Sequence, residues 1–350
     1  MAFGNKNNLV GLDIGSRILK AAEIVETKRG YRLRKFCTID IPPGLIEDGT
    51  INDSEKIAEY IRKLFKDNKL TENNVAVSIG GFAVIVKKIY VQKMDEDKLQ
   101  ETIQFEAEQY IPFDISDVNL DFQIIGENEN NPNQMSVFLV AAKKEMVNEY
   151  LNLVQIAGLN PCIIDVEAFA LQNIFEFNYD ESSENIALID IGASKTSLNI
   201  LKGFSSLFMR DVSLGCGQIN QKIVSLAGCT LEEAEQIKFG SQNDKVSTDD
   251  LKEIVSSVVS DWCTEIKRAL DFFYSTYPDD SITKIILSGG GANIKDFRQL
   301  LSMETSAEVE LIDPFNKLEL ADNLDSTYLE KIAPQAAISM GLALRRIDDK

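Results

Sequence analysis

Two short segments of the chain repeat one pattern, and this repeat constrains the fold more than any other feature. The segments are LVGLDIGS around Asp13 and ALIDIGAS around Asp190. In each, an apolar run ends in Asp-Ile-Gly and a small residue, which predicts a buried strand that turns tightly into a second strand. One such turn alone is ordinary, because Asp and Gly are common in turns of every kind. Two matched copies indicate an internal duplication.

Both turns have the chemistry of a polyphosphate site. Gly15 and Gly192 lack the Cβ that would keep backbone amides away from phosphate oxygens. Asp13 and Asp190 would repel a phosphate unless a divalent cation lay between them, so the pair of turns predicts a nucleotide bound with Mg. Hydroxyl and ammonium donors stand close to the turns in the sequence, at Ser16, Lys20, Ser194, Lys195 and Thr196.

Composition excludes several classes of function. The chain of 350 residues contains no histidine, which rules out Ser-His-Asp catalysis and His-ligated zinc or iron. Its net charge of −19 opposes binding to nucleic acid or to anionic lipid. We find no apolar run long enough to span a bilayer and no signal-peptide core, so we expect a cytoplasmic protein without direct membrane insertion. The five cysteines form no Cys-x-x-Cys pair, which agrees with reduced thiols.

The element pattern predicts an α/β protein with five parts. Between about 75 and 165, strands and helices alternate as in a compact α+β unit, with the polar segment GENENNPNQ between two of its strands. We interpret this unit as an insertion into the first half. The predicted parts are a first lobe at 1–74, the insertion at 75–165, a connecting helix and linker at 166–184, a second lobe at 185–333, and a second connecting helix at 334–350.

Three further segments of the second half are candidates for nucleotide contacts. The glycine-rich turn after the strand KIIL suits a flat or anionic ligand, although a plain tight loop fits equally well. A helix start at SLGCGQIN can direct amides at phosphates, or be only a helix start. Glu235 and Lys238, three residues apart on a short helix, can contact a sugar and base or form a surface ion pair. The candidates are Gly215, Gly217, Gln218, Glu235, Lys238, Gly289, Gly290, Gly291 and Ala292.

The segment Asp165-Val-Glu167 precedes an apolar helix that should lie under the predicted cleft. Glu167 is the candidate catalytic residue, because a carboxylate there can orient a water towards a terminal phosphate. The alternative is that both carboxylates simply stabilise the first turn of the helix.

In this order, LDIGS, DVEAFAL, LIDIGAS, LSGGGA and APQAAISMGLAL resemble the motifs of the actin-like ATPase superfamily, to which actin, heat-shock chaperones, sugar kinases and FtsA belong. The resemblance implies a two-lobed, duplicated ribonuclease H-like fold with an inserted α+β subdomain of the FtsA type. It also implies ATP and Mg as cofactors, with Asp13 and Asp190 towards the metal. The implied cofactor contacts add Arg17 and Ala193 to the residues named above, and Arg17 stands where many relatives have a small hydroxyl residue.

Within the superfamily the chain most resembles the PilM family of type IV pilus assembly. The segments DIGSRILKAAEI, QIAGLNPCIIDVEAFAL and TLEEAEQIKFG carry this resemblance, as does the stretch ETIQFEAEQYIPFDISDVNLDFQ. It implies a cytoplasmic scaffold with at most slow ATPase activity. The scaffold would hold the cytoplasmic N-terminal peptide of a PilN-type single-span protein of the inner membrane. It would also contact cytoplasmic pilus motor ATPases and associate with itself.

Two other functions stay open at the level of sequence. A sugar or small-acid kinase of the same superfamily would need an aspartate base in a substrate cleft, and no segment of the sequence indicates such a base. An FtsA-like division protein would carry an amphipathic membrane-targeting helix after a linker, whereas this sequence ends in LALRRIDDK. We therefore expect recruitment to the inner membrane through a protein partner.

Overall fold

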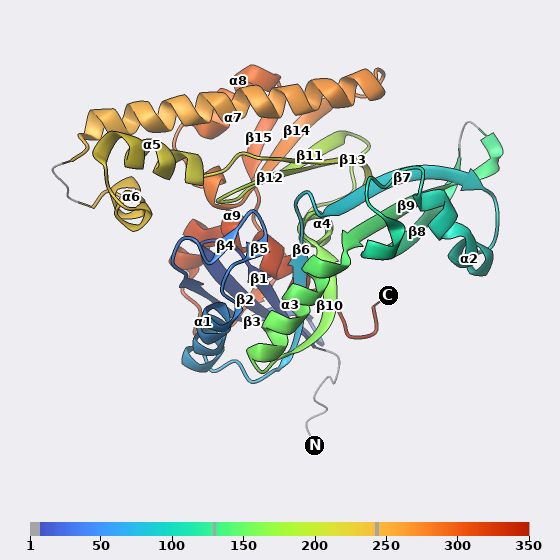
Figure 1. Ribbon diagram of the computed structural model, residues 1–350, viewed down its shortest axis with the longest axis horizontal. Helices are drawn as coiled ribbons and strands as arrows, with labels where there is room; N and C mark the ends of the chain where they lie inside the picture. The colour runs from blue at the N-terminus through green and yellow to red at the C-terminus, as the bar shows by residue number, and fades with distance from the viewer. Residues whose placement is uncertain (1–7, 129–130, 242–244, 350) are drawn as a thin grey trace.

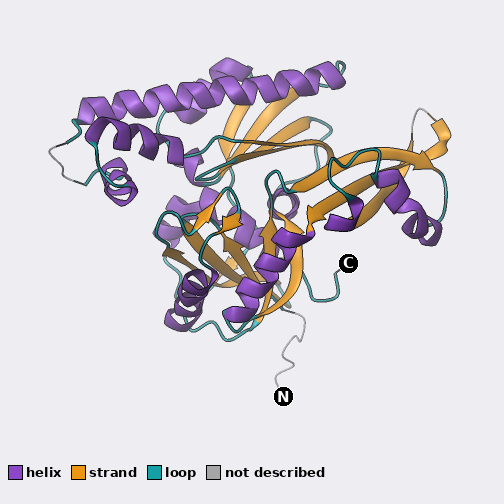
Figure 2. Cartoon of the chain, viewed as in Figure 1, coloured by secondary structure: helices purple, strands orange, loops and turns teal. Residues whose placement is uncertain are grey.

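The three larger of the four sheets in the described residues divide the chain into two lobes and a side domain (Figure 1, Figure 2). The computed structural model describes residues 8–128, 131–241 and 245–349. The first seven residues, where we expect no signal-peptide core, lie outside this part, as do residues 129 and 130 of the predicted polar loop. Within it, no helix is both long enough and apolar enough to cross a membrane.

The first lobe is built on a six-stranded sheet in the order β10-β6-β1-β2-β3-β16. Its middle strands β1, β2 and β3 form an antiparallel meander, β6 runs parallel to β1, and β10 runs parallel to β6. The strands are β1 (Val10–Ile14), β2 (Ile18–Thr27), β3 (Gly30–Asp40), β6 (Asn74–Ile79), β10 (Asn160–Val166) and β16 (Glu319–Leu320). Between β3 and β6 lie the hairpin β4 (Ile46–Glu47) and β5 (Thr50–Ile51) and helix α1 (Ser54–Asp67).

The two faces of this sheet have different neighbours, because successive residues of a strand point to opposite sides. On one face, Ala21 shares a core with helices α1 and α3 (Lys144–Ile156). On the other, Ala22 shares a core with α4 (Glu167–Asn178), α9 (Ser326–Ala343) and strands of the second lobe. Helices α4 and α9 therefore lie between the two lobes (Figure 1). A Cβ on Gly341 of α9 would overlap the backbone of α4, so this glycine permits the close approach of the two helices.

The second lobe repeats the plan of the first, and with it the predicted two-lobed α/β fold is confirmed. Its sheet has the order β13-β12-β11-β14-β15, again with an antiparallel meander whose first strand pairs in parallel with a later one. The strands are β11 (Asn185–Ile191), β12 (Thr196–Lys202), β13 (Ser205–Val212), β14 (Ile282–Ser288) and β15 (Glu308–Leu311). Helices share a core with this sheet on its outer face: α5 (Gly217–Ala227), α6 (Leu231–Lys238), α7 (Thr248–Thr276) and α8 (Phe297–Thr305).

A side domain with its own core extends from the first lobe (Figure 1). Its sheet has the order β7-β9-β8. The elements are β7 (Val84–Gln92), α2 (Glu96–Ala107), the 3-10 helix η1 (Ile115–Asp117), β8 (Val118–Asn128) and β9 (Asn131–Lys143). The predicted range 75–165 also takes in β6, α3 and β10, which belong to the sheet and core of the first lobe. We therefore propose that the inserted subdomain spans 84–143.

Helix starts follow from local side-chain chemistry. The Asp53 carboxylate accepts from the backbone amide of Lys56 at 3.0 Å and caps α1. At the start of α6, the Thr230 hydroxyl accepts from the amide of Glu233, and the Glu233 carboxylate accepts from the amide of Thr230. This reciprocal pair is a capping box, whose sequence signature is the Thr-x-x-Glu spacing of Thr230 and Glu233. It fixes the helix that carries Glu235 and Lys238.

Candidate functional site

The two repeated turns meet at a cleft between the lobes. One turn joins β1 to β2 and the other joins β11 to β12. Across the gap, the hydroxyl oxygens of Ser16 and Ser194 lie 3.4 Å apart. The cleft has a volume of about 430 Å³, which lies within the range of small-molecule and cofactor sites.

The first-lobe wall pairs an acid with a base. Antiparallel register places Asp13 of β1 opposite Lys20 of β2. The Lys20 ammonium lies 2.7 Å from the Asp13 carboxylate, and both side chains are largely buried at the cleft. This pair offers either a carboxylate to a cation or an ammonium to a phosphate.

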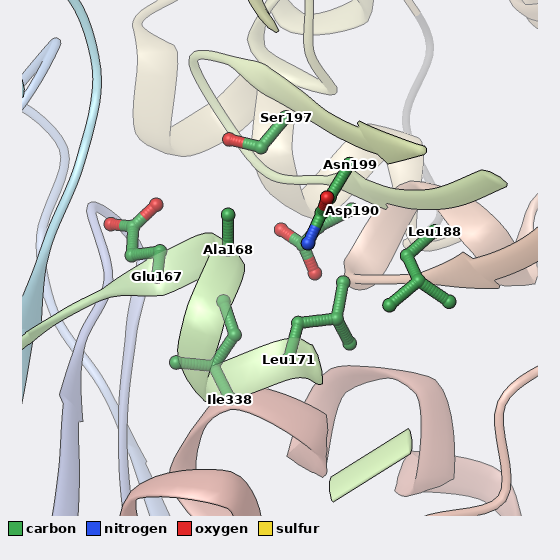
Figure 3. A pocket seen from close by; sticks show the side chains of 8 residues that line it. All are labelled: Glu167, Ala168, Leu171, Leu188, Asp190, Ser197, Asn199 and Ile338. Atoms are coloured by element: carbon green, nitrogen blue, oxygen red, sulfur yellow. The ribbon is translucent and has the colours of Figure 1, made fainter. Parts of the chain in front are cut away.

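The second-lobe wall centres on Asp190, the last-but-one residue of β11. Its carboxylate accepts a hydrogen bond from the Ser288 hydroxyl at 2.8 Å. Asp190 lines a small pocket with the apolar side chains of Ala168 and Leu171, and Glu167 lies on the far side of Ala168 from Asp190 (Figure 3). Burial, together with the negative charges of Glu167 and Asp13, raises the pKa of Asp190 to about 6, although the hydrogen bond from Ser288 acts in the opposite direction. The wall therefore favours a cation close to this carboxylate.

Glu167, the candidate catalytic residue, is the first residue of α4 and lines the cleft. Its carboxylate lies 2.6 Å from the ammonium of Lys195 in the second turn. Burial alone would lower the pKa of Lys195, but the charges of Glu167 and Asp211 outweigh burial and hold the pKa above its ordinary value. Lys195 is therefore charged, and it holds Glu167 in an ion pair. Asp165 is not at the helix start but on β10, where its carboxylate lies 2.7 Å from the guanidinium of Arg345.

A second acid–base pair lines the far end of the cleft. Glu235 and Lys238 lie 2.7 Å apart, and Asn220 also donates to the Glu235 carboxylate. Burial would raise the pKa of Glu235, but its contacts with Lys238 and Asn220 keep the pKa below its ordinary value. The next residue, Phe239, lines the cleft with its ring largely exposed. A charged pair beside an exposed ring suits a sugar and a planar base.

Arg17 reaches across the cleft from the first turn. Its Nη2 lies 3.6 Å from Glu235 of the second lobe. The other two guanidinium nitrogens, Nε and Nη1, are buried without a hydrogen-bond partner. By contrast, Lys20, Lys195 and Lys238 each have a carboxylate oxygen within 2.7 Å. Unpaired buried donors are costly, so Arg17 has the open capacity for an anionic ligand.

The glycine-rich turn after β14 closes the cleft. Gly289 adopts a positive φ of 84°, which favours glycine, and it lines the cleft together with Gly290. Sequence reasoning missed Asn293 and Lys295, which line the cleft just beyond this turn. Their position directly after the glycine run could have indicated them.

The structure brings fifteen of the predicted residues into the cleft lining and leaves six outside it. Those in the lining are Asp13, Gly15, Ser16, Arg17, Lys20, Glu167, Asp190, Gly192, Ala193, Ser194, Lys195, Glu235, Lys238, Gly289 and Gly290. Those outside it are Thr196, Gly215, Gly217, Gln218, Gly291 and Ala292.

The residues outside the lining have structural contacts instead. The Thr196 hydroxyl is buried and donates to the carbonyl of Leu214. Gln218 accepts from the indole of Trp262 at 2.6 Å. The Gly217 amide donates to the carbonyl of Ala193 at 2.7 Å, so it is not available to a ligand. A Cβ on Gly215 would lie 2.6 Å from the same carbonyl oxygen, and Gly291 and Ala292 are buried.

The carboxylates of the cleft fit a magnesium ion that is shared with phosphates. Among the described residues, no three His, Cys, Asp or Glu side chains form a metal-ligand cluster. Mg²⁺ does not need such a cluster, because it is commonly held by one or two carboxylates, substrate phosphates and water. Asp13 and Asp190 face each other closely enough for the charge of one to raise the pKa of the other. Asp13 and Asp190 line the cleft and can therefore supply the one or two carboxylates that Mg²⁺ takes from a protein.

A second cavity of about 270 Å³ lies beside the cleft. It is bordered by β7, an edge strand of the side-domain sheet, and by β13, an edge strand of the second-lobe sheet. Its lining is mainly apolar, with Asp211 and Glu167 among its charged groups. Gly80 and Glu167 line both cavities.

Comparison with known families agrees with this architecture. The family described as type IV pilus assembly protein PilM matches residues 11–347. The chain belongs to the PilM family of type IV pilus assembly proteins. A solved structure of a PilM-PilN type IV pilus biogenesis complex has 27% sequence identity and a TM-score of 0.87, and the match covers 98% of this chain and 99% of that one.

More distant structures share the fold of this PilM-family chain. The ethanolamine utilization protein EutJ from Carboxydothermus hydrogenoformans has 15% identity and a TM-score of 0.59, covering 98% of this chain and 90% of its own. MreB 5 of Spiroplasma citri bound to AMPPNP has 12% identity and a TM-score of 0.50, and the match covers 97% of this chain and 95% of that one. These likenesses confirm the predicted actin-like ATPase fold.

Proposed function

We propose that this chain binds Mg·ATP between its lobes and acts as a cytoplasmic scaffold of type IV pilus assembly. The observation that carries the proposal is the meeting of the two repeated turns, at Ser16 and Ser194, over one cleft. MreB 5, which shares the fold, was solved bound to AMPPNP and to ADP. Family membership supports the pilus role.

In this proposal each wall of the cleft contacts a different part of the nucleotide. Asp13 and Asp190 would hold Mg²⁺, which supplies positive charge to the phosphates. The far end, with Glu235 and Lys238, would hold the adenosine. The phosphates would contact Gly15, Ser16, Arg17 and Lys20 from the first lobe and Gly192, Ala193, Ser194 and Lys195 from the second, while Gly289 and Gly290 would border the adenosine.

We expect ATP turnover to be slow at most. The candidate base Glu167 lies 2.6 Å from Lys195, so it can accept the proton of an attacking water only when this ion pair opens. A sugar or small-acid kinase would need, in addition, an aspartate base in a substrate cleft between the lobes. Slow turnover suits a scaffold in which the nucleotide sets the arrangement of the lobes.

The second cavity is our candidate site for a partner peptide. A solved structure that matches 98% of this chain is a PilM-PilN complex. We propose that the cytoplasmic N-terminal peptide of a PilN-type inner-membrane protein binds between β7 and β13. Edge strands have free backbone donors and acceptors, to which an extended peptide can add, and the apolar lining suits its side chains. Binding there would place the chain at the inner membrane through its partner.

Two titrations separate this scaffold from a kinase. The purified chain is titrated with Mg·ATP, and then with a synthetic peptide copying the cytoplasmic N-terminus of the PilN-type protein of the same organism. We expect both to bind and sugars to leave ATP turnover unchanged. Stimulation of turnover by sugars over orders of magnitude, without peptide binding, would instead identify a kinase.

A pair of variants tests the location of the peptide. Val86→Asp places a charge in the apolar lining of the second cavity and should weaken peptide binding about ten-fold or more, because a buried unpaired charge costs several kcal/mol. Ile124→Asp is the matched control, since Ile124 lies on β8 of the same sheet and outside this lining. Equal affinities for the two variants would place the peptide elsewhere.

A further inference from the structure

A tyrosine lines the nucleotide cleft from a helix that carries none of the repeated motifs. Tyr150 lies on α3 and packs in the core that α3 shares with α1. The residue is only 4% exposed, and yet it belongs to the lining of the cleft. A buried tyrosine keeps its ring in apolar surroundings and directs its hydroxyl to a polar partner. The hydroxyl is therefore the part of Tyr150 that can contact a ligand.

In this structure the hydroxyl of Tyr150 has a weak partner. It donates to the carbonyl of Gly49 at 3.4 Å, whereas hydroxyl hydrogen bonds are usually about 2.7–2.8 Å long. Burial, together with the negative charges of Glu167 and Asp13, raises the pKa of Tyr150 well above its ordinary value. The hydroxyl therefore keeps its proton at neutral pH, and it can donate to a stronger acceptor that comes within reach.

The turn that contains Gly49 fixes the position of this carbonyl. Asp48 and Gly49 form the two-residue loop between β4 and β5, and their φ values are both positive, at 49° and 83°. Such a loop is typical of a type I′ hairpin turn, for which Asp-Gly is a preferred sequence. A Cβ on Gly49 would lie 3.4 Å from the methyl group of Met146 and 3.8 Å from the carbonyl oxygen of Gly80. The loop thus packs between α3 and the end of β6.

These groups lie in the part of the cleft that contains Glu167. Gly49, Gly80, Tyr150 and Glu167 all belong to the cleft lining. A Cβ on Gly80 would lie 2.7 Å from the Glu167 carboxylate, so the backbone of Gly80 packs directly against that side chain. In the proposed function, Glu167 is the candidate base for a water that attacks the terminal phosphate. The terminal phosphate of ATP would therefore lie in this part of the cleft.

A terminal phosphate is a stronger hydrogen-bond acceptor than a carbonyl, because its oxygens carry negative charge. We propose that the Tyr150 hydroxyl leaves the Gly49 carbonyl and donates to the terminal phosphate of ATP, so that Tyr150 makes the cleft prefer ATP to ADP. ADP lacks this phosphate and leaves the hydroxyl on Gly49. The inference rests on the proposed function, because it takes the nucleotide as the occupant of the cleft.

The test measures the dissociation constants of Mg·AMPPNP and Mg·ADP by titration calorimetry, for the unchanged chain and for Tyr150→Phe. The substitution removes the hydroxyl and keeps the ring in the core. We expect the unchanged chain to bind AMPPNP more tightly than ADP. In the variant the affinity for AMPPNP should fall about ten-fold, the scale of one hydrogen bond to a charged group. The affinity for ADP should stay the same.

A tyrosine outside the cleft provides a matched control. The hydroxyl of Tyr328 on α9 lies 3.0 Å from the hydroxyl of Thr38, and Tyr328 is not part of the cleft lining. Tyr328→Phe should therefore leave both dissociation constants unchanged. Tyr150→Leu, which also lacks the hydroxyl, should again weaken AMPPNP binding more than ADP binding. Thermal unfolding of each variant shows which of them are folded.

Three results would overturn the inference. If the unchanged chain binds AMPPNP and ADP with equal affinity, Tyr150 does not select for the terminal phosphate, although the proposed function stands. If Tyr150→Phe lowers both affinities by the same factor, or lowers neither, its hydroxyl does not contact that phosphate. If the unchanged chain binds neither nucleotide, the proposed function fails and the inference fails with it.

Discussion

The hydroxyl oxygens of Ser16 and Ser194 lie 3.4 Å apart, although 178 residues separate them in the sequence. Each stands directly in a turn of the repeated motif, one from each lobe. The contact places the two halves of the duplication face to face. A ligand that enters between the lobes must therefore touch both turns.

We predict that this contact can be trapped and that nucleotide prevents the trapping. In the double variant Ser16→Cys with Ser194→Cys, mild oxidation should form an intramolecular disulfide, since the two side chains already meet. Saturating Mg·ATP should slow the reaction by occupying the cleft. The faster-migrating species on a non-reducing gel measures the disulfide, and the two single variants serve as controls. A rate unaffected by nucleotide would show that the ligand does not lie between these turns.

Asp13→Ala should remove the magnesium dependence of nucleotide binding without unfolding the chain. The variant loses a proposed metal ligand but frees Lys20, which lies 2.7 Å away, to bind a phosphate. We expect affinity for Mg·ATP to fall about ten-fold or more, the scale of one contact to a charged group. Affinity in excess chelator should not fall. Titration calorimetry with and without Mg²⁺ measures both, and Asp40→Ala at the exposed end of β3 is the control. An unchanged response to Mg²⁺ would remove Asp13 from the metal site.

Arg17→Gln should weaken binding of ligands that carry phosphate and spare those that do not. Two nitrogens of Arg17 are buried at the cleft without a partner. If these nitrogens donate to a phosphate when ATP is bound, their loss should lower the affinity for ATP about ten-fold, as for other charge-assisted hydrogen bonds. Adenosine should bind as before. Arg29→Gln, at the exposed turn between β2 and β3, controls for the loss of one positive charge. Equal losses for ATP and adenosine would indicate that Arg17 only shapes the cleft.

The parts of the fold that the sequence could predict are those set by local chemistry. The turns at Gly15 and Gly192 follow from apolar runs that end in Asp-Ile-Gly, and the cap at Asp53 follows from one side chain at a helix start. The capping box of Thr230 and Glu233 is likewise a contact within four residues. Each of these is decided by neighbours in the chain.

The features that sequence reasoning misplaced depend on partners far away in the chain. Gln218 lies in a segment that reads as a ligand-facing helix start, but its carbonyl points to Trp262 of α7. Asp165 reads as part of a helix start, but pairs with Arg345 near the other end of the chain. No local pattern distinguishes a polar residue that faces a ligand from one that satisfies a buried donor.

Gln218→Ala therefore should destabilise the chain and leave nucleotide binding intact. The variant leaves the indole N–H of Trp262 without its acceptor, and Trp262 is fully buried in the second-lobe core. An unsatisfied buried donor costs about 1–3 kcal/mol. Urea denaturation followed by the fluorescence of the single tryptophan measures the loss. Gln221→Ala, on the exposed face of the same helix, should cost far less. A loss of ATP affinity with no change in the free energy of unfolding would show that Gln218 contacts the nucleotide.

Cys216 should be nearly inert to alkylation at neutral pH although it lines the cleft. Burial raises the pKa of Cys216 to about 11. At pH 8 only about one molecule in a thousand then carries the reactive thiolate, against about a quarter for a thiol with an ordinary pKa near 8.5. A raised pKa lowers the fraction of thiolate at every pH below that pKa. The alkylation rate of Cys216 in the folded chain should therefore be at least about 100-fold below its rate in urea. It should rise about ten-fold per pH unit from pH 8 to 10, with Mg·ATP slowing it further. Iodoacetamide labelling read out by peptide mass spectrometry gives both rates. A native rate within ten-fold of the rate in urea would mean that the cleft exposes this thiol to water.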